Sequence, residues 1–117
     1  MRLFEGSEEF QRDFIHVADA VKINLHFFQT KSSGIFNAGT GKARSFTDIA
    51  RTMQSMHGNG EIEDTLFPED LRGKYQKFTE AGLDNLRVAG YSEDFMSIEE
   101  GVRQYYDQLS LSNGLYT

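Results

Sequence analysis

The residues best suited to hold a ligand fall in one stretch near the start of the chain, residues 3–14. Phe4 offers an aromatic face, and Ser7 with the neighbouring amides offers hydrogen-bond donors. Gly6 lets the backbone turn sharply or come close to a bound group. Arg12 carries a planar guanidinium fork that matches a diphosphate. Together these groups would suit a phosphorylated ligand with a ring to stack and hydroxyls to bond.

The same stretch also has a purely structural interpretation. A loop that carries Phe, Gly, Ser and Arg is usually only a loop, and Arg12 beside Asp13 is usually a surface or strand-edge ion pair. Loops also carry a large share of binding residues. The chemistry of the side chains alone therefore leaves both interpretations open.

A second candidate stretch, residues 71–79, holds the densest cationic patch of the chain. Arg72, Lys74 and Lys77 surround Tyr75 there, without a clear helical or strand period. Composition by itself favours a solvated loop over a binding loop at this place.

A glycine pair at 39–41 raises the question of a phosphate cradle. Gly39-Thr40-Gly41 follows a predicted strand and precedes a predicted helix, as in a dinucleotide-binding turn. The third glycine of that turn is missing at the required spacing. An ordinary strand-to-helix turn is the better interpretation.

Composition excludes several function classes. The 117 residues make one domain, and the formal charge of -6 argues against sequence-independent nucleic-acid binding. With no cysteine and three scattered histidines, neither disulfides nor a metal-ligand spacing is available. No apolar run approaches the roughly 20 residues of a membrane span, and no signal peptide is visible. We expect a cytoplasmic protein without membrane contact.

Hydrophobic spacing and capping signals predict an α/β chain. The predicted strands are 13–17, 35–38 and 62–67. The predicted helices are 20–30 capped by Asp19, a second from the box Ser45–Asp48 to a stop at 57–60, a third over 79–89, and a fourth after the box Ser97–Glu100.

The side chains of these helices have expected positions. In the first helix, Val21, Leu25 and Phe28 should face the core, with Ile23 and Phe27 broadening the stripe. In the second helix the Met53 and Met56 pair should fill gaps in the core. His57 should be a loop residue, because it stands beside Gly58-Asn59-Gly60.

Four blocks of sequence, in unbroken order, resemble one enzyme family. They are Leu3–Phe14 with the following Ile15-His16-Val17, then Ser33–Gly41, Leu71–Thr79 and Leu83–Tyr91. The resemblance is to the C-terminal half of the ADP-glycero-manno-heptose 6-epimerases, which are extended short-chain dehydrogenase/reductases (SDRs) acting on nucleotide-sugars. Arg-Asp-Phe followed by Asn-x-Gly-Thr-Gly recurs across the extended family, whereas Phe-Glu-Gly-Ser with Gly-Lys-Tyr-Gln is similar to the heptose epimerases in particular.

The resemblance implies a fold and a substrate site. It implies residues 1–112 as a C-terminal substrate-binding portion, with late Rossmann strands near 13–17 and 35–38, a helical substrate-binding domain and a frayed tail at 113–117. The substrate would be ADP-heptose, an intermediate of lipopolysaccharide inner-core synthesis. The family arginine before the binding tyrosine appears here as Lys74, which keeps the charge but loses the bidentate fork. The substrate-contacting set that the resemblance implies is Phe4, Glu5, Gly6, Ser7, Arg12 and Tyr75.

The resemblance also shows what this sequence lacks. Such an epimerase uses NADP to remove and return a hydride, with a Tyr-x-x-x-Lys pair for proton transfer. None of the five tyrosines has a lysine four residues later, and the Gly-rich cofactor turn is absent. We expect the chain alone to be inactive and not to bind NADP. The alternatives are a non-catalytic nucleotide-sugar-binding module or remnant, and a fragment of another nucleotide-sugar epimerase or dehydratase.

The absent neighbours of the predicted strands have a structural consequence. They would leave an apolar face or an unpaired sheet edge exposed. We therefore expect a homo-oligomer, formed by self-association or strand exchange.

Overall fold

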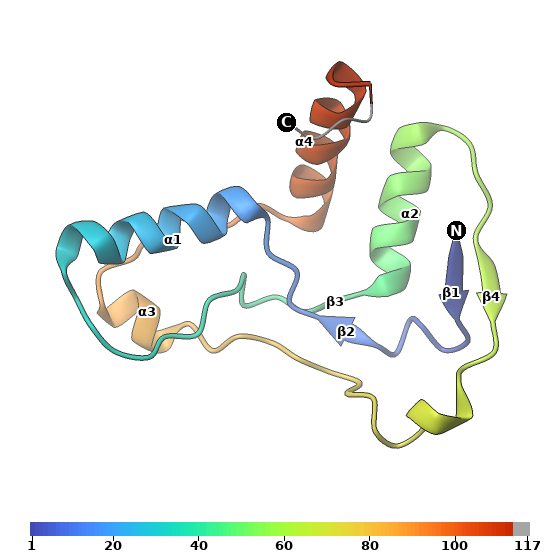
Figure 1. Cartoon of the computed structure of the whole chain (residues 1–117), viewed down its shortest axis with the longest axis horizontal. Coiled ribbons are helices and arrows are strands. Elements are labelled where there is room, and N and C mark those ends of the chain that lie inside the picture. Colours follow the sequence, from blue (N-terminus) through green and yellow to red (C-terminus); the bar gives the residue numbers. More distant parts are fainter. Residues whose placement is uncertain (114–117) are drawn as a thin grey trace.

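The computed structural model describes residues 1–113, whose short strands and helices spread into a thin slab (Figure 1). None of the helices in this range is both long and apolar enough to cross a bilayer. In chain order the elements are β1 (Arg2–Phe4), β2 (Gln11–Arg12), α1 (Val17–Thr30), β3 (Arg44–Ser45), α2 (Phe46–His57), β4 (Glu63–Thr65), the 3-10 turn η1 (Glu69–Leu71), α3 (Asp84–Val88) and α4 (Ile98–Leu111).

Two helices begin at the capping boxes that the sequence predicts. The Ser45 side chain accepts from the backbone N–H of Asp48, and the Asp48 carboxylate accepts from the Ser45 N–H. Ser97 and Glu100 make the same reciprocal pair at the start of α4. Each box satisfies two amides that a helix start would otherwise leave unpaired. Gly58, in the left-handed region at φ 79°, ends α2 as expected.

Helix α1 begins three residues earlier than predicted, and its cap is not Asp19. His16 is the N-cap, with its Nδ1 accepting from the backbone N–H of Ala18. Asp19 lies in the first turn, is 1% exposed, and accepts a 2.8 Å hydrogen bond from the Met96 N–H. A carboxylate near a helix N-terminus is favourable inside the first turn as well as at the cap. Asp19 therefore joins α1 to the segment that leads into α4.

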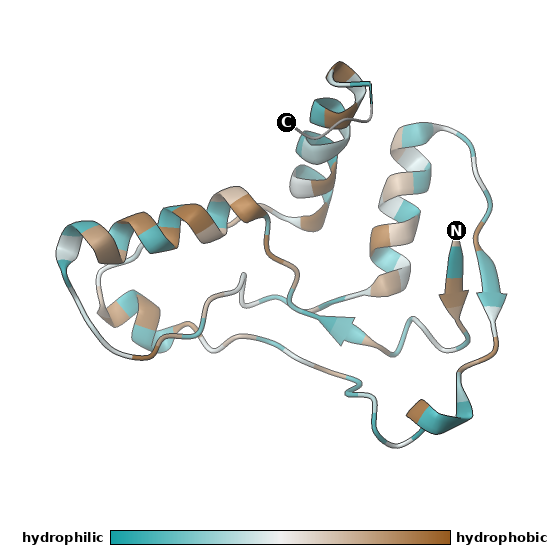
Figure 2. Cartoon of the chain, viewed as in Figure 1, coloured by the Kyte–Doolittle hydropathy of each residue, from teal (hydrophilic) through white to brown (hydrophobic). Residues whose placement is uncertain are grey.

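The predicted core stripe of α1 is wrong. Ile23 is buried against Leu86 and Tyr91, with Phe27 packed beside them. Val21, Leu25 and Phe28 are instead 49%, 51% and 82% exposed. Apolar bands recur along the helix in Figure 2. Because α1 is apolar on two sides, periodicity could not tell which side the chain itself would cover.

The strands form two small ladders rather than one continuous sheet. Strand β1 pairs in parallel with β4, with Leu3 opposite Asp64, and β2 pairs antiparallel with β3. The predicted strand at 62–67 is thus present in its central residues. The strands predicted at 13–17 and 35–38 are not formed, since a strand needs a neighbour for its ladder hydrogen bonds and residues 1–113 provide none for either segment. Ile35, expected to be buried, is 95% exposed.

Three further expectations are corrected. The helix predicted over 79–89 is confined to α3, because residues 79–81 run extended and bond to Gln11 and Asp13 instead. His57 is the last residue of α2 rather than a loop residue, and its Nδ1 lies 2.9 Å from the Tyr106 hydroxyl on α4. Met53 is 43% exposed, not core. Of the tail predicted at 113–117, residues 114–117 lie outside the described residues.

One carboxylate holds three distant segments together. Asp13 accepts hydrogen bonds from the Thr40 amide and hydroxyl, the Gly41 amide and the Ala81 amide, at 2.6–3.1 Å. Burial by itself would raise the pKa of Asp13, but these donors outweigh it and hold the pKa below its usual value. The packing is close here, because a Cβ on Gly39 would stand 2.6 Å from the Asp13 carboxylate.

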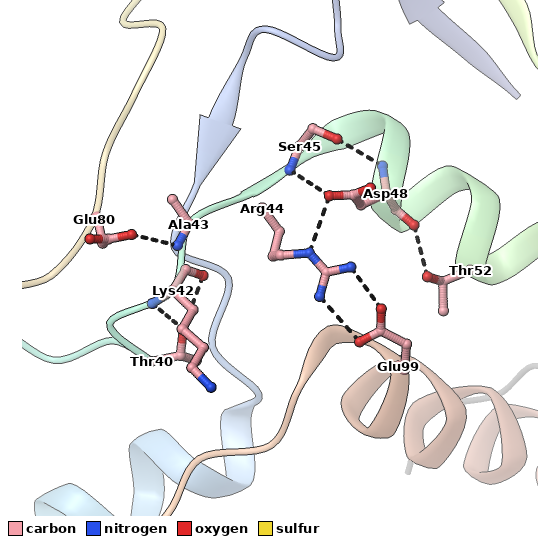
Figure 3. A network of polar contacts seen from close by, with 9 residues as sticks. All are labelled: Thr40, Lys42, Ala43, Arg44, Ser45, Asp48, Thr52, Glu80 and Glu99. Carbon is pink, nitrogen blue, oxygen red and sulfur yellow. Dashed lines mark hydrogen bonds and ion pairs between the residues drawn. The ribbon is translucent and has the colours of Figure 1, made fainter.

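An arginine connects the starts of α2 and α4 (Figure 3). Arg44 donates from Nε to Asp48 at 3.1 Å and from both terminal nitrogens to Glu99 at 2.7 and 3.2 Å. The hydrogen bond from Arg44 lowers the pKa of Glu99, and the same partnership raises the pKa of the guanidinium. The fork-to-carboxylate geometry fixes the relative position of the two helices.

We predict that Asp13→Ala destabilises the chain by about 2–3 kcal/mol at neutral pH, because it leaves four partly buried donors without their partner. Since the folded pKa of Asp13 is lowered, its contribution is present above the usual value of 3.8 and is lost as the pH falls through the folded pKa. The difference in unfolding free energy between the two proteins should therefore shrink below about pH 4. Urea denaturation across pH measures it. Asp64→Ala, at an exposed carboxylate, is the control and should change little; an equal loss there would contradict the assignment.

Candidate functional site

A hollow of about 190 Å³ opens between the N-terminal strand, the start of α2 and the loop before residue 76. Most of its lining is aromatic or aliphatic, with one serine and one arginine. The residues that line it are Arg2, Leu3, Phe4, Ser7, Phe10, Phe46 and Tyr75.

Aromatic rings build one wall of the hollow. Phe10 stacks on Phe67 with ring centres 5.4 Å apart, and Phe4 meets the same Phe67 edge-on at 5.4 Å. The Tyr75 ring stands edge-on to Phe10 at 5.1 Å and to Phe67 at 5.8 Å. Edge-to-face and stacked contacts of this kind give aromatic clusters a defined geometry. The cluster joins residues that are more than 60 positions apart in the chain.

Arg12 packs against the same aromatic cluster but does not line the hollow. Its guanidinium carbon is 5.0 Å from the centre of the Tyr75 ring and 5.8 Å from that of Phe46, which are cation–π distances. Two of its nitrogens donate to the carbonyls of Gln11 and Gln76. The expected ion pair between Arg12 and Asp13 is not formed, since the Asp13 carboxylate bonds to the Thr40 loop.

The hollow therefore gathers most of the residue types that the sequence singles out. Phe4, Ser7 and Tyr75 line it, and Arg12 contacts the Tyr75 ring. Glu5 is exposed and Gly6 forms the turn, with a φ of 77° that favours glycine. Neither Glu5 nor Gly6 lines the hollow. The two distant stretches of the sequence thus meet at one place.

Ser7 has a structural contact of its own. It is 4% exposed, and its Oγ lies 2.8 Å from the Thr47 hydroxyl in the first turn of α2. This hydrogen bond fixes the Ser7 turn, which lines the hollow, to the first turn of α2. The free hydroxyl that the sequence suggests for ligand contact is already paired.

The cationic patch around Tyr75 is partly neutralised. Arg72 pairs with Glu69 at 3.3 Å, and Lys77 lies 3.9 Å from Glu9. Lys74 is exposed and makes no ion pair within residues 1–113. Exposed ion pairs of this kind contribute little to stability, so these side chains remain available to an anion.

The glycine turn at 39–41 is not a phosphate cradle. Its amides at Thr40 and Gly41 donate to the Asp13 carboxylate, which takes the place that a phosphate would occupy. The residues present do not fit the diphosphate of a dinucleotide cofactor. No group of three or more possible metal ligands occurs in the described part of the chain either.

The aromatic wall includes residues that the sequence did not single out. Phe10, Phe46 and Phe67 complete it, yet none was predicted to contribute. Phe10 stands inside the candidate stretch and Phe67 directly precedes Pro68. With ten phenylalanines in the chain, no spacing distinguished these three from core residues.

The fold is that of the SDR-type nucleotide-sugar epimerases and dehydratases. A crystal structure of the Helicobacter pylori ADP-L-glycero-D-manno-heptose-6-epimerase matches with a TM-score of 0.80 at 23% identity, over 94% of this chain and 33% of that one. An NAD-dependent NDP-hexosamine 5,6-dehydratase of tunicamycin biosynthesis matches with a TM-score of 0.72 at 21% identity, over 92% of this chain and 35% of that one. The Methanobrevibacter ruminantium UDP-N-acetylglucosamine 4-epimerase matches with a TM-score of 0.71 at 21% identity, over 92% of this chain and 34% of that one.

Sequence comparison is more specific. The chain is 50% identical over 115 residues to the ADP-L-glycero-D-manno-heptose-6-epimerase of Brachyspira hyodysenteriae, which confirms the resemblance to these heptose epimerases. No protein-family model matches the chain. The match covers 97% of this chain and 36% of that relative, so the chain spans about a third of the relative's length. The mixed helix and strand structure is consistent with a C-terminal part of the fold.

Proposed function

We propose that this chain is the substrate-binding part of a cytoplasmic, NADP-dependent epimerase that interconverts ADP-D-glycero- and ADP-L-glycero-manno-heptose. The observation that carries the proposal is that Phe4 and Tyr75, from two distant stretches, line one hollow, with Arg12 against the Tyr75 ring. The 50% identity to an enzyme named for that substrate supports the choice of ligand. In this proposal residues 1–112 form the substrate-binding portion.

The side chains suggest a division of labour toward the ligand. Arg12 has a fixed fork with only part of its donors engaged, and it would contact the diphosphate. Phe4 and Tyr75 offer ring faces, and the Tyr75 hydroxyl makes no hydrogen bond within residues 1–113. Glu5 would accept from sugar hydroxyls, and Gly6 lets the turn approach the ligand. Because the Oγ of Ser7 is paired with Thr47, we assign Ser7 to shaping the hollow.

The chain's own residues orient the ligand rather than transform it. NADP, where bound in the parent enzyme, supplies the hydride chemistry. Residues that could cradle its diphosphate or form a Tyr-x-x-x-Lys pair are not found in this sequence. We therefore assign no proton-transfer step to this chain.

We predict that ADP binds the chain with heat measurable by titration calorimetry. Arg12→Ala should weaken binding roughly 10- to 150-fold, since a hydrogen bond to a charged group contributes about 1.5–3 kcal/mol. Arg51→Ala removes the same charge from an exposed site on α2 and should leave affinity unchanged. Tyr75→Phe, which keeps the ring that supports Arg12, tests the hydroxyl separately. No heat at millimolar ADP, or an equal loss in Arg51→Ala, would contradict the site.

We further predict that the chain alone does not turn over its substrate. When it is mixed with ADP-glycero-manno-heptose and NADP, the ratio of the C6 epimers followed by NMR should stay constant. Epimerisation by the isolated chain would sink this part of the proposal.

Binding without turnover is also the behaviour of a non-catalytic nucleotide-sugar module. The structural neighbours include enzymes named for UDP- and NDP-sugars, so a side-by-side titration with ADP-, UDP- and GDP-sugars is informative. A preference for UDP- or GDP-sugars would indicate a sister enzyme.

We also propose that the chain forms a homo-oligomer through its sheet edges. The ladder of β1 with β4 has only two strands within residues 1–113, so it leaves backbone donors and acceptors on its outer sides, whereas β2 already bonds to residues 77–79 on the side away from β3. Such edges are templates for pairing with a second copy. Sedimentation equilibrium should show a concentration-dependent increase in mass, and a strict monomer would contradict the proposal.

A further inference from the structure

The link between α2 and β4, residues 58–62, contains one of the two Asn-Gly pairs of the sequence, Asn59-Gly60 (Figure 1). The side-chain amide of an asparagine can be attacked by the backbone nitrogen of the next residue, and a glycine there has no Cβ to obstruct the approach. Asn59 is exposed and belongs to neither a helix nor a strand. Within residues 1–113 its side chain makes no hydrogen bond, and the Gly60 N–H donates to no acceptor. The two groups that would react are therefore both unengaged.

The backbone around Asn59 has room to rearrange. Gly58 and Gly60 have φ values of 79° and 110°, and beyond their chain neighbours no heavy atom lies within 4 Å of the place where a Cβ would stand at either residue. Gln54 on α2 anchors both sides of the pair. Its carbonyl accepts from the Gly58 N–H at 3.0 Å, and its side-chain amide donates to the Gly60 carbonyl at 2.7 Å. The peptide group between Asn59 and Gly60 takes part in neither bond, so it can turn the Gly60 nitrogen toward the Asn59 side chain.

The other asparagines lack this combination of features. The Asn24 side chain is hydrogen-bonded within α1, and Asn85 lies in α3. Asn37 is exposed but precedes an alanine, whose Cβ obstructs attack by the backbone nitrogen. The second Asn-Gly pair begins at Asn113, and its glycine lies outside the described residues.

We propose that Asn59 is a site of spontaneous deamidation, and that its isoaspartate product weakens the ladder of β1 with β4. The Gly60 nitrogen loses its proton and attacks the Asn59 Cγ, which closes a succinimide ring. The bond from Cγ to Nδ2 breaks, and ammonia leaves with that proton. Water then opens the ring, giving aspartate by hydrolysis at Cγ or isoaspartate by hydrolysis at the main-chain carbonyl. One water enters and one ammonia leaves, with no oxidation or reduction.

Isoaspartate would change the chain just before it enters β4. It routes the backbone through the former side chain, which adds one methylene to the link and leaves a carboxylate beside it. Glu61 and Glu63 follow, so the new charge joins two like charges. The ladder of β1 with β4 has only three residues in each strand, and a two-stranded ladder is marginally stable by itself. The longer link and the added charge therefore both act against the pairing.

Deamidation of Asn59 requires no ligand and does not depend on the proposed nucleotide-sugar site. Strand β1 ends at Phe4, which lines the hollow, so a weakened ladder would also loosen one wall of the hollow. Ageing experiments contain no nucleotide, whereas ADP titration of fresh protein tests the hollow. Each proposal can therefore fail while the other stands.

The site is tested by incubating the full chain at mildly alkaline pH and mapping its peptides over time by mass spectrometry. The peptide with Asn59 should gain one mass unit at least ten times faster than the peptide with Asn37, and isoaspartyl methyltransferase should label it. Its rate should be similar in the folded chain and in urea. Asn59→Gln is the matched control, because its longer side chain would have to close a larger and less favourable ring. The control peptide should keep its mass and stay unlabelled.

Two results would overturn the site. Asn59 could react no faster than Asn37. Alternatively, its rate in the folded chain could fall more than tenfold below the rate in urea, which would mean that the folded link prevents the attack.

The effect on the ladder is tested by hydrogen exchange of the isoaspartate form, separated from unreacted protein by anion exchange. The amides of Glu5 and Glu63, which donate to carbonyls across the ladder, should exchange faster, whereas those of α4 should not change. Fresh Asn59→Asp adds the charge without lengthening the backbone and should give a smaller increase. Unchanged exchange in the ladder, or an equal increase in Asn59→Asp, would overturn the proposed effect of isoaspartate.

Discussion

The hydrogen bonds to the Asp13 carboxylate determine where the distant parts of this chain meet. They bring the segment after β2, the turn at 39–41 and residue 81 to one point. Directly beside this point, Gln11 bonds to the backbone on either side of Phe78. The loop that carries Tyr75 is thereby drawn toward Arg12. In a chain with few buried apolar residues, this well-satisfied carboxylate joins three segments that are distant in the sequence.

The hollow follows from this arrangement combined with aromatic packing. Asp13 fixes the backbone on one side, and the hydrogen bond between Ser7 and Thr47 fixes the start of α2 on the other. The rings of Phe10, Phe67 and Tyr75 pack against one another, and those of Phe10 and Tyr75 line the hollow. The position of Arg12 is stabilised by the Tyr75 ring, over which its charge lies, and by hydrogen bonds from two of its nitrogens to backbone carbonyls. The site is therefore made by long-range contacts, although its residues come from short local motifs.

Local signals in the sequence were sufficient where a contact spans few residues. The boxes at Ser45 and Ser97 predicted the starts of α2 and α4, because both partners of each box lie within three positions. The meeting of Phe4 with Tyr75 came from the resemblance to a known family and not from any spacing. The covered side of α1 could not be predicted, since both sides are apolar. Strands at 13–17 and 35–38 could not be judged either, because a strand depends on neighbours that no local pattern reveals.

The thinness of the slab also has a thermodynamic consequence. Unfolding changes the heat capacity and responds to denaturant in proportion to the surface newly exposed to water. A chain that already exposes 8402 Å² in its folded state has less surface left to expose than a compact protein of equal mass. Its folded and unfolded states therefore differ less in hydration, so we expect a broader thermal transition than that of a compact protein of equal mass. A partner that covered the broad side would increase the surface exposed on unfolding and would sharpen that transition, with no new contact inside the chain itself.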